Sequence, residues 1–313
     1  MTIKTDDIGD QDRVQAHCQT INPQTSNQAN LMTITKVEST EVQEPIQYPH
    51  DNVVSQLVVL VRRDRYATRD KLRFERAASC FLNTFMSTPG LAKGDFQKAL
   101  RESDAVFKKY QKTGDPGLIP PEILSDLDDT IACLDILTPR RTMIHKEIEK
   151  KAAELPVADW WTSHRGLNLK GLGLIIGNVG ELSTFNKDAG LWQRFGLRNY
   201  NFKAPSSYSA SELTKEEWVM LGYSKRRRSV MYTVVDSMLR HQRKVADHDA
   251  KPGPHRWEAA GEYGELAINR YVQSMDEHPD WVPLHRERDV NRVVGKRLLV
   301  DLRWAWNGAL IGV

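Results

Sequence analysis

The chain has 313 residues, of which 40% are hydrophobic and 27% are charged, and its formal net charge is only +3. This composition can bury a sizeable core, and it means that a nucleic-acid surface would have to arise from local clustering of basic residues. The scattered cysteines argue against a disulfide framework or a zinc finger, and without a signal-peptide core or an apolar run long enough to span a membrane we expect a cytoplasmic protein with no membrane partner.

Residues 1–50 are rich in Thr, Gln, Asn, Ser and Asp and show no sustained periodicity, which predicts a disordered tail. From Asp51, a good N-cap residue, the spacing of apolar residues predicts one long helix or two short ones that reach about Met86. Asp95 is expected to cap a second helix, and residues 114–117 (GDPG) to form a turn.

The next helix is expected to begin at Pro121 and to be interrupted at Pro139, after which a charged helix runs to Pro156. The many charges of this last helix indicate a solvated face, with a coiled-coil or partner-binding face as the alternative. We therefore expect residues 51–155 to form a helical region that could support a homodimer.

The stretch 169–182 (LKGLGLIIGNVGEL) places two glycines, Gly171 and Gly173, on either side of Leu172. We expect these glycines to form a turn, with a helix that begins just after Gly173. The free amide groups of such a helix start, together with Lys170, would bind a phosphate group, as in a helix-hairpin-helix unit. The alternative is an ordinary glycine-rich bend between core helices.

A second basic element begins at Ser224, where four consecutive cations fill the first turn of an amphipathic helix. Positive charges oppose the helix dipole at this end, so a bound phosphate would interact favourably with both the cations and the dipole. Arg240 and Arg243 extend the basic character, and a merely solvated basic face is the alternative. The predicted nucleic-acid-binding residues are Lys170, Gly171, Leu172, Gly173, Ser224, Lys225, Arg226, Arg227, Arg228, Arg240 and Arg243.

Residues 246–313 are expected to supply a linker and two helices, Gly264–Met275 and Leu284–Trp306, that pack on the module 156–245, with Gly308 as a C-cap. The histidines of this part are spaced too far apart along the chain to share one metal ion, so we predict no metal site and no cofactor. The fold class expected for the whole chain is mostly α, with a helix-hairpin-helix-like DNA-binding module and a disordered N-terminal tail.

The order of these motifs resembles a known family. After the glycine pair come Glu181-Leu182, Phe185 and Phe195-Gly196-Leu197, and then the basic helix start Ser224-Lys225-Arg226. This order is similar to the C-terminal transposase domain of the RuvC-like (DEDD-type) insertion-sequence transposases and pilin-inverting recombinases. The resemblance covers about residues 156–240 and implies a role in DNA recombination or transposition of a mobile element.

The family's N-terminal nuclease half is not recognisable here, because the one strand-like run, 57–61, carries no acidic residue. The resemblance implies a serine nucleophile in the loop before the basic helix, where Ser206, Ser207 and Ser209 are weak candidates. We therefore expect a transposase-like protein that binds the backbone of DNA or structured RNA without nuclease activity of its own. The alternatives are a serine-dependent recombinase subunit that acts with a separate nuclease, and a non-enzymatic helical scaffold.

Overall fold

A computed structural model describes most of the chain. Within these residues the protein is mostly α-helical, as the sequence predicts. The predicted tail 1–50 and the candidate serines Ser206, Ser207 and Ser209 lie outside the described residues. The described residues are 51–86, 93–199, 217, 224–246 and 254–311.

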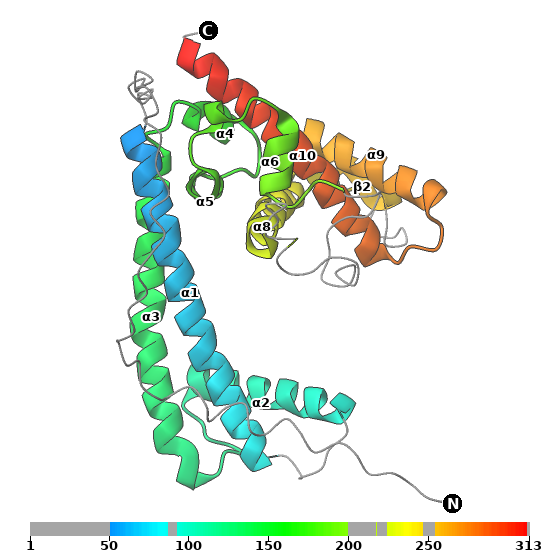
Figure 1. Ribbon diagram of the computed structural model, residues 1–313. Helices are drawn as coiled ribbons and strands as arrows, with labels where there is room; N and C mark the ends of the chain where they lie inside the picture. Colours follow the sequence, from blue (N-terminus) through cyan, green and yellow to red (C-terminus); the bar gives the residue numbers. More distant parts are fainter. Residues whose placement is uncertain (1–50, 87–92, 200–216, 218–223, 247–253, 312–313) are drawn as a thin grey trace, which may run out of the picture. The chain divides into compact units, whose positions relative to one another are not determined.

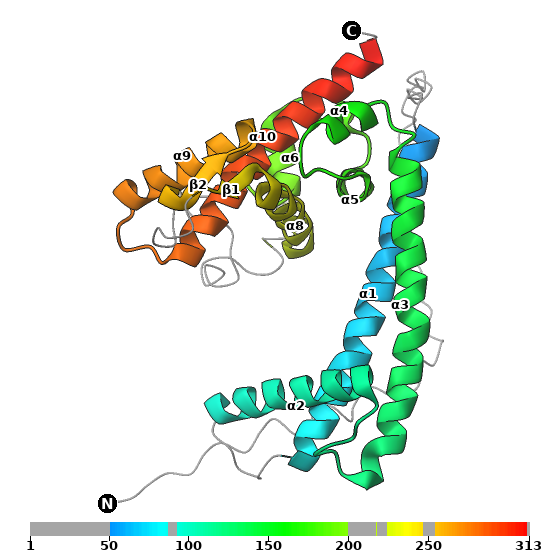
Figure 2. The same ribbon diagram turned by 180° about the vertical axis from the view of Figure 1, so that it is seen from behind.

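Two long helices, α1 (Asp51–Met86) and α3 (Leu124–Ala152), lie side by side in both views of the structure (Figures 1 and 2). Of the two predicted alternatives for 51–86, one long helix or two short ones, the structure has the single long helix. The predicted interruption of α3 at Pro139 is wrong, because the helix continues through the proline. Buried side chains on both sides of the proline hold α3 against its neighbours, and this packing outweighs the loss of one backbone hydrogen bond.

Helix α2 (Lys93–Thr113) packs on α1, and a turn follows it at Gly114 and Gly117, as predicted. A short 3-10 helix, η1 (Pro121–Ile123), begins at the predicted proline and leads directly into α3. This end of α1 and α3 has its own small hydrophobic core. Its members are Ala78, Leu82, Phe107, Tyr110, Ile119, Ile123, Leu127 and Leu134.

The middle of the chain consists of short elements around one well-packed helix. Helix α4 (Ala158–Ser163) precedes α5 (Leu169–Val179), and the 3-10 helix η2 (Leu182–Thr184) and helix α6 (Asp188–Arg194) follow it. Helix α5 packs against both α1 and α3 and also contacts α8. It therefore connects the long N-terminal helices with the C-terminal part of the fold.

The basic helix α8 (Lys225–Gln242) begins at the predicted position and ends in a small antiparallel hairpin. Strand β1 (Arg243–Val245) pairs with β2 (Trp257–Ala259), which follows the 3-10 helix η3 (Pro254–Arg256). Strand β1 therefore lies directly before the expected linker, and β2 lies within it. Figure 2 shows this hairpin beside α9.

The chain closes with α9 (Glu262–Glu277) and α10 (Pro283–Ile311), close to the two predicted helices. Helix α10 continues past Gly308, so the predicted C-cap at this glycine is wrong. Both helices contact α8, as expected for a C-terminal part that packs on the preceding module.

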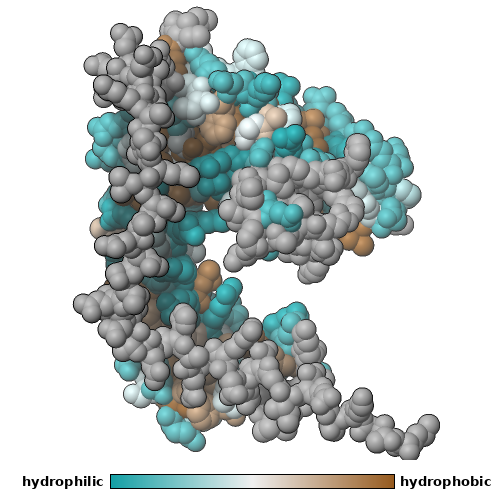
Figure 3. Space-filling view, viewed as in Figure 1, coloured by the Kyte–Doolittle hydropathy of each residue, from teal (hydrophilic) through white to brown (hydrophobic). Residues whose placement is uncertain are grey.

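The larger hydrophobic core contains residues from the predicted helical region 51–155 and from the part of the chain that follows it. Leu57 of α1, Ile148 of α3, Ile176 of α5, Val235 of α8 and Leu298 of α10 are all fully buried members of it. Where residues are coloured in Figure 3, hydrophilic side chains cover most of the visible surface, and hydrophobic ones appear as separate small patches. None of the helices among the described residues combines the length and the apolar character of a membrane span.

Candidate anion-binding site

Helix α5 corrects the predicted turn at the glycine pair. The helix begins at Leu169, so Gly171, Leu172 and Gly173 lie inside it, and all three are buried. The bend lies earlier, where Gly166 has a φ of 87°. The three residues are therefore packed in the core and do not offer backbone amides to a ligand, which is closer to the alternative of a structural glycine segment.

Close packing explains why glycines occur in α5. A Cβ atom on Gly173 would lie 2.5 Å from Cγ2 of Ile148 in α3, and one on Gly177 would lie 2.4 Å from Cγ2 of Val61 in α1. Real Cβ atoms do not approach other atoms so closely. The glycines thus let α5 approach two neighbouring helices at once.

The start of α8 matches the predicted helix start. Ser224 has extended backbone angles, and its Oγ accepts a hydrogen bond from the N–H of Arg227 at 3.4 Å, which is an N-cap. The carbonyl of Ser224 accepts from the N–H of Arg228. Among the described residues, no hydrogen-bond partner is found for the amides of Lys225 and Arg226, so they are available to a ligand.

The structure separates the predicted basic residues into two groups. Arg226, Arg227 and Ser224 line a hollow in the surface, and Lys170 and Arg226 line a second hollow beside it. Lys225 is exposed and lines neither of them.

The other predicted cations interact with side chains of the protein itself. Arg228 donates to the hydroxyl of Tyr232 at 3.1 Å. Arg240 pairs with Asp236 one turn earlier at 2.8 Å. Arg243 pairs with Glu287 at 3.1 Å and lies over the ring of Trp257. These contacts favour a structural role for Arg240 and Arg243 over phosphate binding.

The first hollow, which we call the arginine pocket, has a volume of about 280 Å³. Helices α1, α5, α6 and α8 all contribute to its lining, and none of the described residues that line it is acidic. Within the described part of the chain, none of its arginines forms an ion pair with a carboxylate. The arginines of the pocket are Arg62, Arg65, Arg194, Arg226 and Arg227.

Two of these arginines, Arg226 and Arg227, are partly buried close to other positive charges. Burial lowers the pKa of Arg226 and Arg227 from the usual value, and the nearby positive charge of Arg65 lowers both further. Arg194 adds to the effect on Arg227. The Nε atom of Arg194 is itself buried without a hydrogen-bond partner among the described residues. Grouped cations of this kind are stabilised by an anion.

The second hollow, which we call the α1 groove, has a volume of about 610 Å³ and shares Arg65 and Arg226 with the arginine pocket. It follows one face of α1 and continues onto α3, α5 and α8. Its basic residues are Arg65, Arg69, Arg73, Arg76, Arg141, Lys170 and Arg226. The two hollows therefore form one continuous basic surface.

One carboxylate, that of Asp64, lies in the lining of the α1 groove. Its Oδ1 atom is 2.8 Å from Nε2 of His145 and 3.1 Å from Nε of Arg141, and the residue is 6% exposed. Asp64 is therefore occupied by partners on α3. Its charge offsets that of Arg141. On α1, Arg69 pairs with Asp70 at 3.6 Å, whereas no ion pair with a carboxylate is found for Arg65, Arg73 or Arg76 among the described residues.

Sequence reasoning missed the largest part of this surface. The arginines at 62, 65, 69, 73 and 76 are spaced three or four residues apart, so they form one stripe along α1. The stripe extends about 21 Å at the usual helical rise. This spacing is visible in the sequence and could have been recognised, whereas no local signal indicates Arg194.

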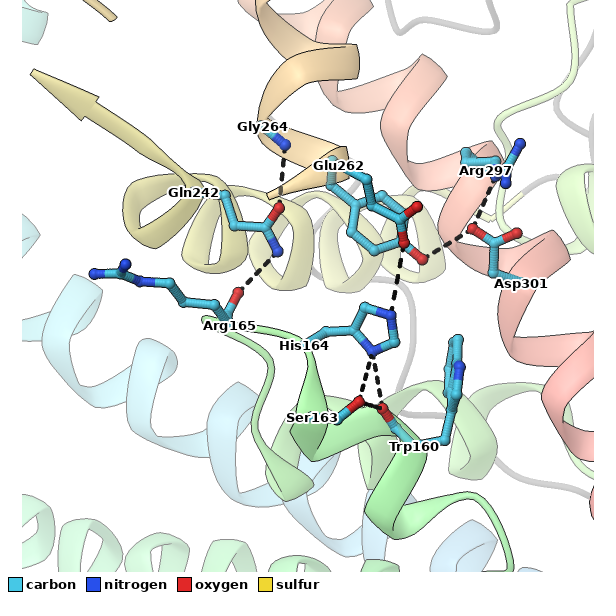
Figure 4. Close-up of polar contacts among 10 residues, drawn as sticks. Trp160, Ser163, His164, Arg165, Gln242, Glu262, Gly264, Arg297 and Asp301 are labelled. Atoms are coloured by element: carbon cyan, nitrogen blue, oxygen red, sulfur yellow. Dashed lines mark hydrogen bonds and ion pairs between the residues drawn. The ribbon is translucent and has the colours of Figure 1, made fainter. Parts of the chain in front are cut away.

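A serine, a histidine and a glutamate also lie together in Figure 4, but they are not arranged for nucleophilic catalysis. Nδ1 of His164 lies 2.8 Å from the carbonyl oxygen of Trp160, and Oγ of Ser163 donates to the same oxygen at 2.7 Å. Because Nδ1 donates to this carbonyl, it cannot accept the proton of Ser163 at 3.4 Å. Both side chains instead donate hydrogen bonds to a backbone carbonyl group near the end of α4.

Figure 4 also shows how the end of α8 is fixed. The buried Gln242 donates from Nε2 to the carbonyl of Arg165 at 3.0 Å and accepts at Oε1 from the N–H of Gly264 at 3.1 Å. One amide side chain thus joins the loop before α5, the end of α8 and the start of α9. This fixes the position of α8, which carries Arg226 and Arg227 of the pocket.

In the described part of the chain, no three His, Cys, Asp or Glu side chains lie close enough together to hold a metal ion. Comparisons of the chain with protein-family models, with curated proteins and with solved structures found no match. The resemblance to the transposase domain therefore stays a prediction from the order of sequence motifs.

Proposed function

We propose that this protein binds the phosphate backbone of nucleic acid, DNA or structured RNA, along the α1 groove and the start of α8. The observation that carries the proposal is the continuous basic surface formed by the two hollows. Among the described residues, ten Arg and Lys side chains line it, against the one carboxylate of Asp64. The whole chain carries a net charge of only +3, so its positive charge is concentrated here.

The side chains of this surface are better suited to bind the phosphate backbone of a nucleic acid than to recognise its bases. Guanidinium groups bind phosphate oxygens with charge-assisted hydrogen bonds, and such contacts do not depend on the base sequence. The arginines of α1 follow each other at intervals of about 5–6 Å along the helix, which suits a row of charges better than a single small anion. A transposase-like role remains compatible with this proposal, which depends on the basic surface and not on a glycine hairpin.

The test is a pair of matched double variants measured by fluorescence anisotropy. The variant Arg73→Gln with Arg76→Gln removes two cations from the α1 groove. The control, Arg63→Gln with Arg240→Gln, removes two exposed cations that lie outside both hollows and pair with Glu147 and Asp236. Both variants change the net charge equally, so they separate a local effect from a general one.

For two unrelated duplexes and one RNA hairpin, we expect the groove variant to bind all of them more weakly. For the duplexes, the slope of log K against log salt should fall by about 1.8, since each lost phosphate contact removes about 0.9. The control should keep the wild-type slope. Equal effects of the two double variants, or no binding by the wild-type protein, would overturn the proposal and favour a helical scaffold.

A further inference from the structure

The arginine pocket differs in character from the α1 groove, although the two share Arg65 and Arg226. Four helices line each hollow, but the pocket has less than half the volume of the groove, about 280 against 610 Å³, and the end of α5 at Gly177–Gly180 forms one of its walls. A strand that follows the groove from Arg76 toward Arg65 therefore reaches the pocket as the end of its path. The pocket is suited to receive the end of a strand.

The charge of the pocket exceeds what an internal phosphate requires. Five arginines line about 280 Å³ without an acidic residue. An internal phosphodiester carries one negative charge, whereas a phosphate monoester at a strand end carries between one and a half and two near neutral pH, by analogy with other phosphate monoesters. The terminal group also exposes more oxygens, which can accept hydrogen bonds from several guanidinium groups at once.

The start of α8 adds a further favourable contribution. The helix has 18 residues, and its N-terminal end carries a partial positive charge of about half an elementary charge. The amides of Lys225 and Arg226 are available there, and the hydroxyl of Ser224 can donate because its oxygen is the acceptor in the N-cap. The C-terminal end of α5 opposes an anion by a similar partial charge, which the full charges of the arginines outweigh.

The fold holds Arg194 in place through its buried Nε atom. It is inaccessible to water and has no hydrogen-bond acceptor among the described residues. Arg194 ends α6, and the ion pair between Asp188 and Arg303 at 2.6 Å holds the start of that helix against α10. The guanidinium group is thus held at the pocket by the fold and does not reach it as a flexible surface side chain.

We propose that the arginine pocket binds the terminal phosphate monoester of a nucleic-acid strand whose next phosphates lie in the α1 groove. This inference rests on the proposed function and adds the class of substrate, a strand with a phosphorylated end. Binding of the end requires no covalent step. It makes the protein selective for broken or processed strands over continuous ones.

The experiment measures the affinity of the protein for three versions of one oligonucleotide by fluorescence anisotropy. The versions carry a 5′-phosphate, a 3′-phosphate or hydroxyl groups at both ends, and all three carry the fluorophore at the same internal nucleotide. We expect one of the two phosphorylated versions to bind at least about tenfold more tightly than the unphosphorylated one. The version that binds more tightly identifies the strand polarity.

Two single variants locate the effect. Arg194→Gln and Arg227→Gln should each remove most of the preference for the phosphorylated end, and each should weaken binding of the unphosphorylated oligonucleotide no more than Arg73→Gln does. Circular dichroism shows whether the variants are folded. The matched control Arg73→Gln should weaken all three oligonucleotides by the same factor and keep the preference.

The outcomes separate this inference from the proposed function. Equal affinity of the wild-type protein for all three oligonucleotides would overturn the end-binding site and leave backbone binding in place. Absence of binding to any oligonucleotide would overturn both. Inorganic phosphate and pyrophosphate serve as competitors. If either displaces the strand end at a concentration close to the dissociation constant of the phosphorylated oligonucleotide, the pocket is a site for free anions instead.

Discussion

The indole N–H of Trp306 donates to Oε1 of Glu181 at 2.5 Å, and both residues are buried. The same oxygen accepts from the N–H and Oγ of Ser183, so three donors converge on one carboxylate oxygen. The contact fixes the segment after α5 to the C-terminal helix α10 across 125 positions of the chain. Glu181 thus has a structural function within the motif on which the family resemblance rests.

Replacing Trp306 by Phe should lower the free energy of unfolding by about 2–3 kcal/mol, because it removes buried volume and leaves Glu181 without its strongest neutral donor. Urea unfolding followed by circular dichroism measures the change. The matched control is Trp304→Phe in the same helix, where the side chain is 67% exposed and a change within about 0.5 kcal/mol is expected. Equal effects at both positions would show that the hydrogen bond to Glu181 contributes little.

The glycines of α5 should differ sharply in their tolerance of alanine. Gly177→Ala places a Cβ atom 2.4 Å from Val61 and 2.7 Å from the carbonyl oxygen of Leu57, so α5 and α1 must move apart. We expect a loss of about 1–3 kcal/mol in the free energy of unfolding, as for other overpacked cores. Thermal and urea unfolding of the purified variant check this value.

Gly171→Ala is the internal control for the same helix. A Cβ atom there would lie 3.4 Å from Val234 and from Asn168, which is close to ordinary contact. Since alanine also favours the helix over glycine by about 0.5–1 kcal/mol, we expect an unchanged or slightly increased stability and unchanged nucleic-acid binding. A selective loss of binding by this variant would instead support the predicted role of Gly171 at a phosphate.

The decrease in the free energy of unfolding at acid pH should depend on Asp289, which is buried between Arg270 and Arg292. Burial alone would raise the pKa of Asp289, but the hydrogen bonds and charges of the two arginines outweigh it and hold the pKa below the ordinary 3.8. A carboxylate whose pKa is lower in the folded state stabilises the protein above its unfolded pKa, and this contribution is lost as the pH falls through the folded pKa.

The variant Asp289→Asn should therefore be less stable than the wild type by about 1.5–3 kcal/mol at pH 7. The difference should shrink as the pH falls below about 4, because the wild-type carboxylate then takes up its proton. Urea unfolding of both proteins at several pH values gives this difference directly. A difference that stays constant down to pH 2.5 would mean that the charge of Asp289 is not what stabilises the fold.

Removing the carboxylate from the α1 groove should strengthen nucleic-acid binding. In Asp64→Asn the charge of Arg141 is no longer offset, and an added unit of positive charge near the phosphates is worth about 0.5–1 kcal/mol, or a two- to fivefold gain in affinity. The variant is expected to be less stable, because it loses the ion pair with Arg141 at 3.1 Å. Anisotropy measured well below the unfolding temperature separates the two effects, and weaker binding by folded protein would count against the groove.

The helices of this protein are largely predictable because their signals are local. Asp51 as an N-cap, Pro121 at a helix start and Ser224 before the basic turn all stand where the structure begins a helix or its 3-10 lead-in. Pro139 shows the limit of local rules, since packing of α3 along α1 keeps the helix continuous through a residue that usually ends one. The expected homodimer through the N-terminal helices stays a prediction.

The candidate site was predicted only in part, because it depends on which helices become neighbours. Arg226 and Arg227 were identified from their own sequence context. Arg65 and Arg194 belong to the same pocket, but Arg65 lies 91 positions before the start of the predicted module at residue 156, and Arg194 lies between the module's motifs. The glycine pair predicts a ligand-binding turn because glycine suits a turn as well as it suits a close contact between helices. Only the positions of α1 and α3 distinguish the two possibilities.

The tight fit of Gly173 and Gly177 makes α5 a spacer of fixed width. It contacts α1 on one side and α8 on the other, so the separation of Arg65 from Arg226 is set by buried atoms that no ligand touches. A side chain one methyl group larger in this spacer would widen the opening between the two arginines without altering either of them. The affinity proposed for this surface would thus depend on residues inside the core, which a comparison of surface residues would overlook.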